Sequence, residues 1–177
     1  MAEVCPTAHR VQDLIRSYPG LHLREVARRL DLDVRAANHH LERLAKDGSL
    51  TVRYFGKHKR YFPRRGKDKG EIVDRRDKVV LAQLRNPVRL ALVVHLMALG
   101  PSRLRDVSQR AGITPSRASF HLRKLERGGV VRQTTGTVRL YRVEKAEQLQ
   151  NLLRRFPPMP DLVDDFVDLW KTLTPES

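Results

Sequence analysis

The chain has 177 residues, 40% of them hydrophobic, which allows one domain of ordinary size or two small ones. Its 35 Lys and Arg residues against 20 Asp and Glu residues leave a net charge of +15, which points to nucleic acid or, less often, an anionic membrane as partner. No apolar run approaches the roughly 18 residues of a membrane-spanning helix. The single cysteine, Cys5, excludes an internal disulfide and fits a reducing cytoplasm.

The basic charge is concentrated in two blocks. Residues 1–66 carry +7 and residues 87–160 carry +10, whereas residues 67–86 carry +2 and residues 161–177 carry −4. The first ten residues lack the basic start and apolar core of a signal peptide, so none is expected.

The first 66 residues predict three helices and a β-hairpin. Apolar periodicity and stop signals place the helices at residues 8–18, 23–30 and 34–46. Asp33 is the expected N-cap of the third helix, whose inward face carries Ala37, Leu41 and Leu44. The hairpin strands are expected at 50–55 and 59–62, around a turn at 56–58. A flexible joint at 66–70 and a linker helix at 71–84 follow.

The same order of elements returns at a spacing of 81 residues. Helices are predicted at 87–99, 104–111 and 115–127, and strands at 130–133 and 138–143. Asn86 and Thr114 are the expected caps of the first and third of these helices. The matching positions are mostly apolar or glycine, among them Leu23 and Leu104, Val26 and Val107, Ala37 and Ala118, Leu41 and Leu122, and Gly48 and Gly129. The chain is therefore predicted to hold two copies of one small unit.

Helix, helix, tight turn, helix and two-stranded hairpin is the order of a winged helix-turn-helix. The segments L-R-E-V-A-R-R-L-D-L-D-V-R-A-A-N-H-H-L-E-R-L and L-R-D-V-S-Q-R-A-G-I-T-P-S-R-A-S-F-H-L-R-K-L resemble ArsR/MarR-type transcriptional regulators, and their tandem arrangement resembles archaeal tandem winged-helix regulators. The resemblance implies a mainly α fold with small β-hairpin wings. The expected parts are a winged domain at 1–66, a linker at 67–86, a second winged domain at 87–143 and C-terminal helices at 144–177.

In such a motif the third helix enters the major groove of double-stranded DNA. In the first unit, the outward side chains expected to contact DNA are Arg35, Asn38, His39 and Arg43. Arg and Asn suit this role because they bind guanine and adenine through two hydrogen bonds. In the second unit they are Ser116, Arg117, Ser119 and Arg123. A merely solvated helix face is the alternative, and Phe120 is expected either to touch a thymine methyl or to pack against a partner or the other unit.

Both hairpins carry side chains suited to phosphate or minor-groove contacts. They are Arg53, Lys57, His58, Lys59 and Arg60 in the first hairpin, and Arg132, Thr135 and Arg139 in the second. Tyr61 and its counterpart Tyr141 are instead expected to close the small core beside each hairpin.

Metal, cofactor and catalytic sites are not expected. His40 and His121 occupy matching positions, and the resemblance implies that both are buried, hydrogen-bonded scaffold residues. Cys5 and His9 have a ligand-like spacing but stand alone. The sequence holds no phosphate-binding glycine loop and no nucleophile elbow, and its carboxylates cluster only in the acidic tail.

Two further helices are predicted at 145–156 and 161–173. The second has an apolar stripe opposite an acidic face, so it is expected to cover the core of its own chain, to pair two chains, or to clamp the basic groove. The helix at 87–99 is apolar nearly all round and is a second candidate surface for a homodimer.

These features predict a sequence-specific transcription regulator of the cytoplasm, associated with the nucleoid. One alternative is an architectural chromatin protein that binds DNA with little sequence preference. The other is a tandem winged-helix scaffold for proteins or RNA. The outward Arg35 and Asn38 favour the regulator.

Overall fold

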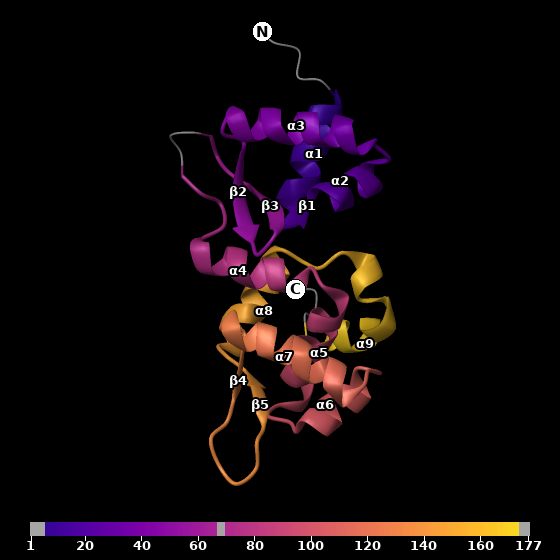
Figure 1. Ribbon diagram of the computed structural model, residues 1–177, viewed down its shortest axis with the longest axis vertical. Coiled ribbons are helices and arrows are strands. Elements are labelled where there is room, and N and C mark those ends of the chain that lie inside the picture. The colour runs from indigo at the N-terminus through magenta and orange to yellow at the C-terminus, as the bar shows by residue number, and fades with distance from the viewer. Residues whose placement is uncertain (1–5, 67–69, 174–177) are drawn as a thin grey trace. The chain divides into compact units, whose positions relative to one another are not determined.

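The computed structural model describes residues 6–66 and 70–173, and the chain divides into two compact units, Met1–Ala82 and Gln83–Ser177 (Figure 1). The boundary lies within helix α4 (Arg75–Leu84). Most of the predicted flexible joint, residues 67–69, lies outside the described residues.

The first unit packs three helices against a small antiparallel sheet. The helices are α1 (Pro6–Ser17), α2 (Leu23–Leu30) and α3 (Val34–Lys46). The sheet has the order β1-β3-β2, from β1 (Leu21–His22), β2 (Leu50–Phe55) and β3 (His58–Pro63). The core between these layers contains Val11, Ile15, Val26, Ala37, Leu41, Tyr61 and Phe62, all without measurable exposure.

Side-chain caps begin the second and third helices of this unit. Asp33 accepts hydrogen bonds from the backbone N–H groups of Arg35 at 2.7 Å and Ala36 at 3.2 Å, which confirms it as the N-cap of α3. His22 caps α2 in the same way, because its Nδ1 accepts from the Glu25 N–H at 3.3 Å.

Helix α1 starts two residues and ends one residue earlier than predicted, and three further features of the first unit also differ. Strand β1 was not expected, and it pairs with β3 through Leu21 and Tyr61. Strand β3 begins one residue early, at His58, because Phe55 pairs with His58 across a two-residue turn in which Gly56 has φ +61°. Helix α4 begins at residue 75 rather than 71, since the Asp74 side chain accepts from the Asp77 N–H at 2.8 Å and so caps the start.

The second unit repeats the order with shorter strands. It contains α5 (Pro87–Leu99), α6 (Leu104–Arg110), α7 (Pro115–Arg127), β4 (Val131–Gln133) and β5 (Tyr141–Val143). Asn86 and Thr114 cap α5 and α7 as expected. The predicted fold class is confirmed: the chain is mainly helical, and each unit carries a small antiparallel hairpin.

The second hairpin and the C-terminal segment correct two predictions. Strand β5 begins at residue 141 rather than 138, because residues 134–140 form a loop that the Thr134 N–H closes by donating to the Leu140 carbonyl at 2.7 Å. Helix α8 (Ala146–Arg155) is followed by two 3₁₀ turns, η1 (Pro160–Leu162) and η2 (Asp164–Phe166), and then by α9 (Val167–Leu173). The single helix predicted at 161–173 is thus interrupted, at Val163, where ψ is −1°.

Helix α5 is enclosed within its own unit. Five of its apolar side chains are buried, namely Leu90, Leu92, Val93, Val94 and Leu96, and α6, α7, β5 and α9 contact it. The C-terminal segment therefore covers the core of its own chain, as one of the sequence interpretations expected. Among the described residues no single helix is long and apolar enough to cross a membrane.

Candidate nucleic-acid interface

The outward face of α3 presents cationic and amide groups to solvent. Arg35, His39 and Arg43 are exposed and Asn38 is half-buried, while the inward residues are buried as predicted. The Asn38 Nδ2 donates to Glu42 Oε1 at 3.0 Å. This bond orients the amide and leaves its second hydrogen and its carbonyl oxygen for another partner.

The outward face of α7 has different chemistry. Ser116, Arg117 and Arg123 are exposed, and Ser119 is half-buried. The Arg123 Nε donates to the backbone carbonyl of Ser119 at 3.4 Å. Phe120 is 50% exposed, so its ring is not enclosed.

His40 and His121 are not the hydrogen-bonded scaffold residues that were expected. Both are half-buried, and the Nδ1 atom of each is buried with no hydrogen-bond partner among the described residues. Each ring instead makes an edge contact with the preceding aromatic ring, His39 at 5.6 Å and Phe120 at 5.2 Å between centroids. Burial lowers the pKa of both histidines, which favours the neutral ring.

The first wing combines exposed basic side chains with basic side chains that support the hairpin. Arg53, Lys57 and His58 are exposed. Lys59 and Arg60 are half-buried: the Lys59 Nζ lies 5.5 Å from the centroid of the Tyr61 ring, and Arg60 donates to the Gly20 carbonyl at 2.6 Å. The predicted core roles of Tyr61 and Tyr141 are confirmed, since they are 0% and 8% exposed.

An ion-pair cluster lies beside this wing. The Lys78 side chain is 1% exposed, and its Nζ lies 2.5 Å from Glu71 Oε1, which also lies 3.4 Å from Arg53. Burial lowers the pKa of Lys78 against the opposing effect of Glu71, and the hydrogen bond from Lys78 lowers the pKa of Glu71. Arg53 therefore has a carboxylate partner that a DNA phosphate would have to replace or share.

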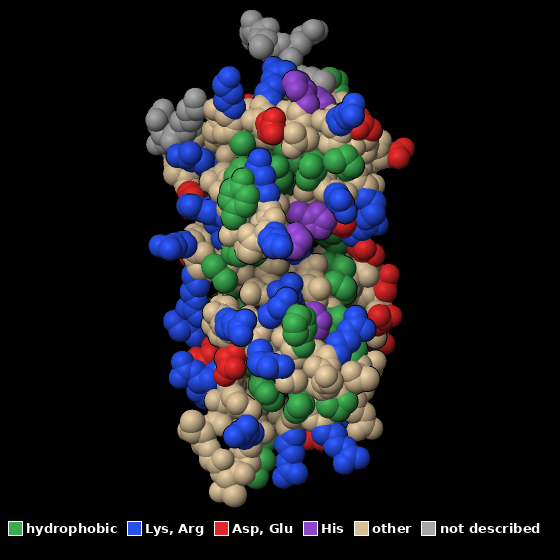
Figure 2. All heavy atoms as spheres, in the orientation of Figure 1, with side chains coloured by type: hydrophobic (Ala, Val, Ile, Leu, Met, Phe, Trp, Pro, Cys, Tyr) green, Lys and Arg blue, Asp and Glu red, His purple; other side chains and the backbone are tan. Residues whose placement is uncertain are grey.

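The second wing exposes Arg132, Thr135 and Arg139. The Arg132 Nε lies 3.2 Å from Glu144 Oε1, which Arg142 also approaches at 3.4 Å. Thr135 and Arg139 belong to the loop at 134–140. Figure 2 shows Lys and Arg side chains over the visible face of each unit, in keeping with the net charge of +15.

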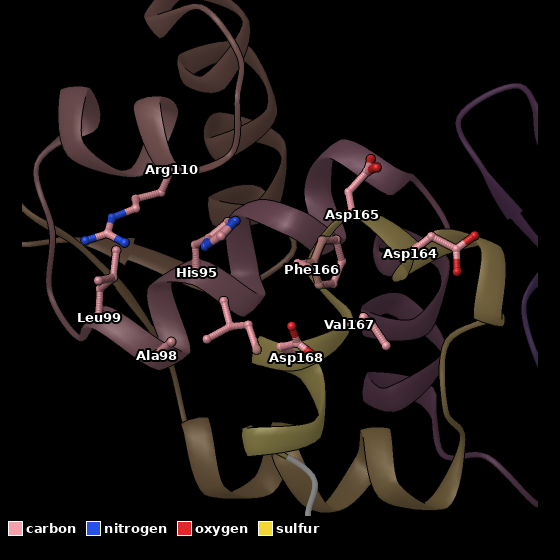
Figure 3. Close-up of a pocket in the computed structure, with 10 residues that line it drawn as sticks. His95, Ala98, Leu99, Arg110, Asp164, Asp165, Phe166, Val167 and Asp168 are labelled. Carbon is pink, nitrogen blue, oxygen red and sulfur yellow. The ribbon is translucent and has the colours of Figure 1, made fainter.

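A pocket of about 410 Å³ opens in the second unit, on α5, the end of α6 and residues 164–169 (Figure 3). The rings of His95 and Phe166 lie 6.2 Å apart at its wall, with Arg110 and three aspartates around them. Burial lowers the pKa of His95, and the charge of Arg110 adds to this effect. Within the described ranges, no group of three or more His, Cys, Asp or Glu side chains could hold a metal ion.

Sequence reasoning missed two features of the first unit, namely the cap formed by His22 and the Glu71–Lys78 pair. A histidine directly before a helix of the motif was the available signal for the cap. The pair had no such signal, because its members lie seven positions apart, Glu71 in an isolated β-bridge and Lys78 in helix α4.

Two domain families match the chain. An N-terminal HTH domain matches residues 6–72, which include α1 to α3 and the first wing. The family described as bacterial regulatory protein, arsR family, matches residues 86–133, which include α5 to α7 and β4.

An uncharacterized HTH-type transcriptional regulator of the archaeon Methanocaldococcus jannaschii is 27% identical over 126 residues. The matched part is 71% of this chain but 30% of that protein, so the chain spans less than a third of the relative's length.

Three solved structures are similar over most of the chain but only weakly. A protein of Corynebacterium diphtheriae has 16% identity and a TM-score of 0.30, covering 78% of this chain and 26% of its own. The mRNA-binding domain of elongation factor SelB from E. coli, in complex with SECIS RNA, has 19% identity and a TM-score of 0.28. This match covers 80% of this chain and 99% of that domain. ScpB from Mycobacterium tuberculosis has 15% identity and a TM-score of 0.29, and the match covers 84% of this chain and 98% of ScpB. At these TM-scores the likenesses indicate neither fold nor function.

The order of elements, the caps and the two family matches agree. The chain carries two winged helix-turn-helix domains in tandem, of which the second matches the arsR family of regulatory proteins.

Proposed function

We propose that the chain is a transcription regulator that binds double-stranded DNA in a sequence-specific manner. The observation that carries this proposal is the repeated third helix, α3 and α7, whose inward side is packed and whose outward side exposes polar and cationic groups. Helix-turn-helix domains place such a helix in the major groove. The description of the archaeal relative as a transcriptional regulator supports the same function.

The side chains divide between base and phosphate contacts. Arg35 and Asn38 have the chemistry for guanine and adenine, and His39, Arg43, Ser116, Arg117, Ser119 and Arg123 lie on the same outward faces. The wings supply phosphate contacts through Arg53, Lys57, His58, Lys59, Arg60, Arg132, Thr135 and Arg139. Such a regulator works in the cytoplasm, associated with the nucleoid.

Homodimerisation remains part of the proposal. Leu99 on α5 is 42% exposed and Val167 on α9 is 38% exposed, and both line the pocket of the second unit. They are the apolar side chains of α5 and α9 that a second chain would cover.

The test is selection of bound sequences from a pool of random duplexes at two salt concentrations. We expect an enriched motif whose preference persists at the higher salt, because base contacts do not release counterions as phosphate contacts do. Binding without enrichment that collapses as salt rises would favour the architectural alternative. Tighter binding to RNA of equal length would favour the scaffold.

A pair of variants at Arg35 separates base recognition from charge. Arg35→Ala should lower discrimination at one position by about 1–3 kcal/mol. Arg35→Lys should lose most of that discrimination and keep the general affinity, because Lys retains the charge without the planar two-donor geometry. Unchanged discrimination in both variants would contradict the assignment of Arg35 to a base.

A further inference from the structure

The 81-residue repeat gives each outward position of α3 a counterpart on α7. The inward residues coincide, because Ala37, Leu41 and Leu44 correspond to Ala118, Leu122 and Leu125, and all six are buried. Outward positions at the same spacing therefore occupy equivalent places on the two helices. The pairs of outward residues are Arg35 and Ser116, Asn38 and Ser119, His39 and Phe120, and Glu42 and Arg123.

Helix α3 offers hydrogen-bonding groups at these places. Arg35 is exposed, and the Asn38 amide is oriented by its 3.0 Å bond to Glu42. Both groups match purine edges in the major groove. Glu42 also places a negative charge on this face, and that charge opposes non-specific attraction to phosphates.

At the position that His39 occupies on α3, helix α7 carries the apolar ring of Phe120. The edge contact with His121, at 5.2 Å and 85°, and the Lys124 Nζ, 4.4 Å from the ring centroid, hold Phe120 on two sides while half of the residue stays exposed. A phenyl ring neither donates nor accepts ordinary hydrogen bonds, and the one apolar group in the major groove is the C5-methyl of thymine.

The two outward faces also differ in charge, because a carboxylate on α3 is replaced by a cation on α7. The position of Glu42 on α3 is taken by Arg123 on α7, beside Arg117 and Lys124. The α7 face is thus cationic without an opposing carboxylate at this place, which favours phosphates of any sequence.

We propose that α3 and α7, the third helices of the two units, recognise different bases. Helix α3 selects purines through Arg35 and Asn38, and helix α7 selects thymine through the methyl group that Phe120 contacts. The inference rests on the proposed function, and it predicts a binding site with two unlike halves, of which the α3 half has the stronger sequence preference.

The experiment replaces thymine by uracil, which removes only the C5-methyl group. The selected duplex is bound to the full chain, and the base preferences that Arg35→Ala abolishes identify the α3 half. Uracil in the other half should weaken binding about fourfold for each contacted methyl, the equivalent of ~0.8 kcal/mol for one buried methyl-sized group. Uracil in the α3 half should leave binding unchanged.

Two variants at Phe120 serve as matched controls. Phe120→Ala should bind the thymine and uracil duplexes equally, and Phe120→Leu should keep part of the preference because it keeps an apolar side chain. Thermal unfolding shows whether each variant folds, which the 50% exposure of Phe120 leads us to expect.

The outcomes separate the two proposals. An enriched motif with identical halves, or one in which uracil has no effect outside the α3 half, would overturn this inference and leave the proposed function standing. The absence of any enriched motif would overturn both.

Discussion

Lys78 is a buried cation that forms an ion pair with the carboxylate of Glu71. Its Nζ lies 2.5 Å from Glu71, and Glu71→Gln would leave the ammonium group buried beside a neutral amide. We expect this variant to lose about 1–3 kcal/mol in the free energy of unfolding measured with urea. Lys78→Met should lose less, because it removes the buried charge and keeps an apolar chain of similar length. Equal stability of Glu71→Gln and the parent chain would show that the pair does not stabilise the fold.

His22 links pH to the stability of the first unit. Its Nδ1 accepts the capping hydrogen bond of α2, and burial, followed by the charge of Arg60, lowers the pKa of His22 from 6.5. The folded chain therefore binds fewer protons here than the unfolded chain, so the free energy of unfolding falls as pH drops below the unfolded pKa. Burial also lowers the pKa values of His40, His95 and His121, which act in the same direction.

The variant His22→Asn isolates this contribution, because Asn keeps a capping acceptor and does not titrate. Thermal unfolding at about pH 7.5 and about pH 5.5 should show a smaller loss of Tm for the variant than for the parent chain. An identical loss in both would assign the pH dependence to the other histidines.

The first wing serves both the fold and the proposed DNA contact, and two substitutions distinguish these roles. Lys57 is exposed at the hairpin turn, so Lys57→Ala should leave stability unchanged and weaken all duplexes alike. The slope of log affinity against log salt should become shallower by about 0.9 for one lost phosphate contact. Arg60→Ala should also cost about 1 kcal/mol of stability, because it removes the bond to the Gly20 carbonyl.

Salt titrations of binding and urea unfolding of the same samples check both expectations. An unchanged salt slope for Lys57→Ala would remove that residue from the DNA surface. Unchanged stability of Arg60→Ala would show that the bond to Gly20 adds nothing to the fold.

At the level of elements, the predictions succeeded where a local signal marks both ends. The bounds of α2, α3, α5 and α7 agree with those expected, since α3, α5 and α7 have a side-chain cap and a breaker within a few residues. Strand β1 was missed because two residues hold no periodic pattern, and its pairing with β3 joins residues 40 apart. The C-terminal helix was predicted too long, because an amphipathic pattern does not reveal the 3₁₀ turns before α9.

For the molecule as a whole, the C-terminal segment is expected to stabilise the second unit. Helix α9 contacts α5, and Phe166 lies 6.2 Å from His95 between ring centroids. A chain ending at Pro160 should therefore unfold at a lower temperature, because part of α5 becomes exposed. Light scattering of the same chain tests the dimer: a change from dimer to monomer would assign the segment to pairing as well as to covering. An unchanged Tm would contradict the covering role.

By itself, the sequence determined the fold class and the two repeated units. Apolar spacing, capping residues and turn residues are local properties, and the excess of Lys and Arg is a sum over the chain, so neither requires coordinates. Only the tertiary structure decided which polar side chains form hydrogen bonds or ion pairs within the chain. The bonds of Arg60 to Gly20 and Arg53 to Glu71 join residues brought together from distant positions, which no pattern along the chain encodes.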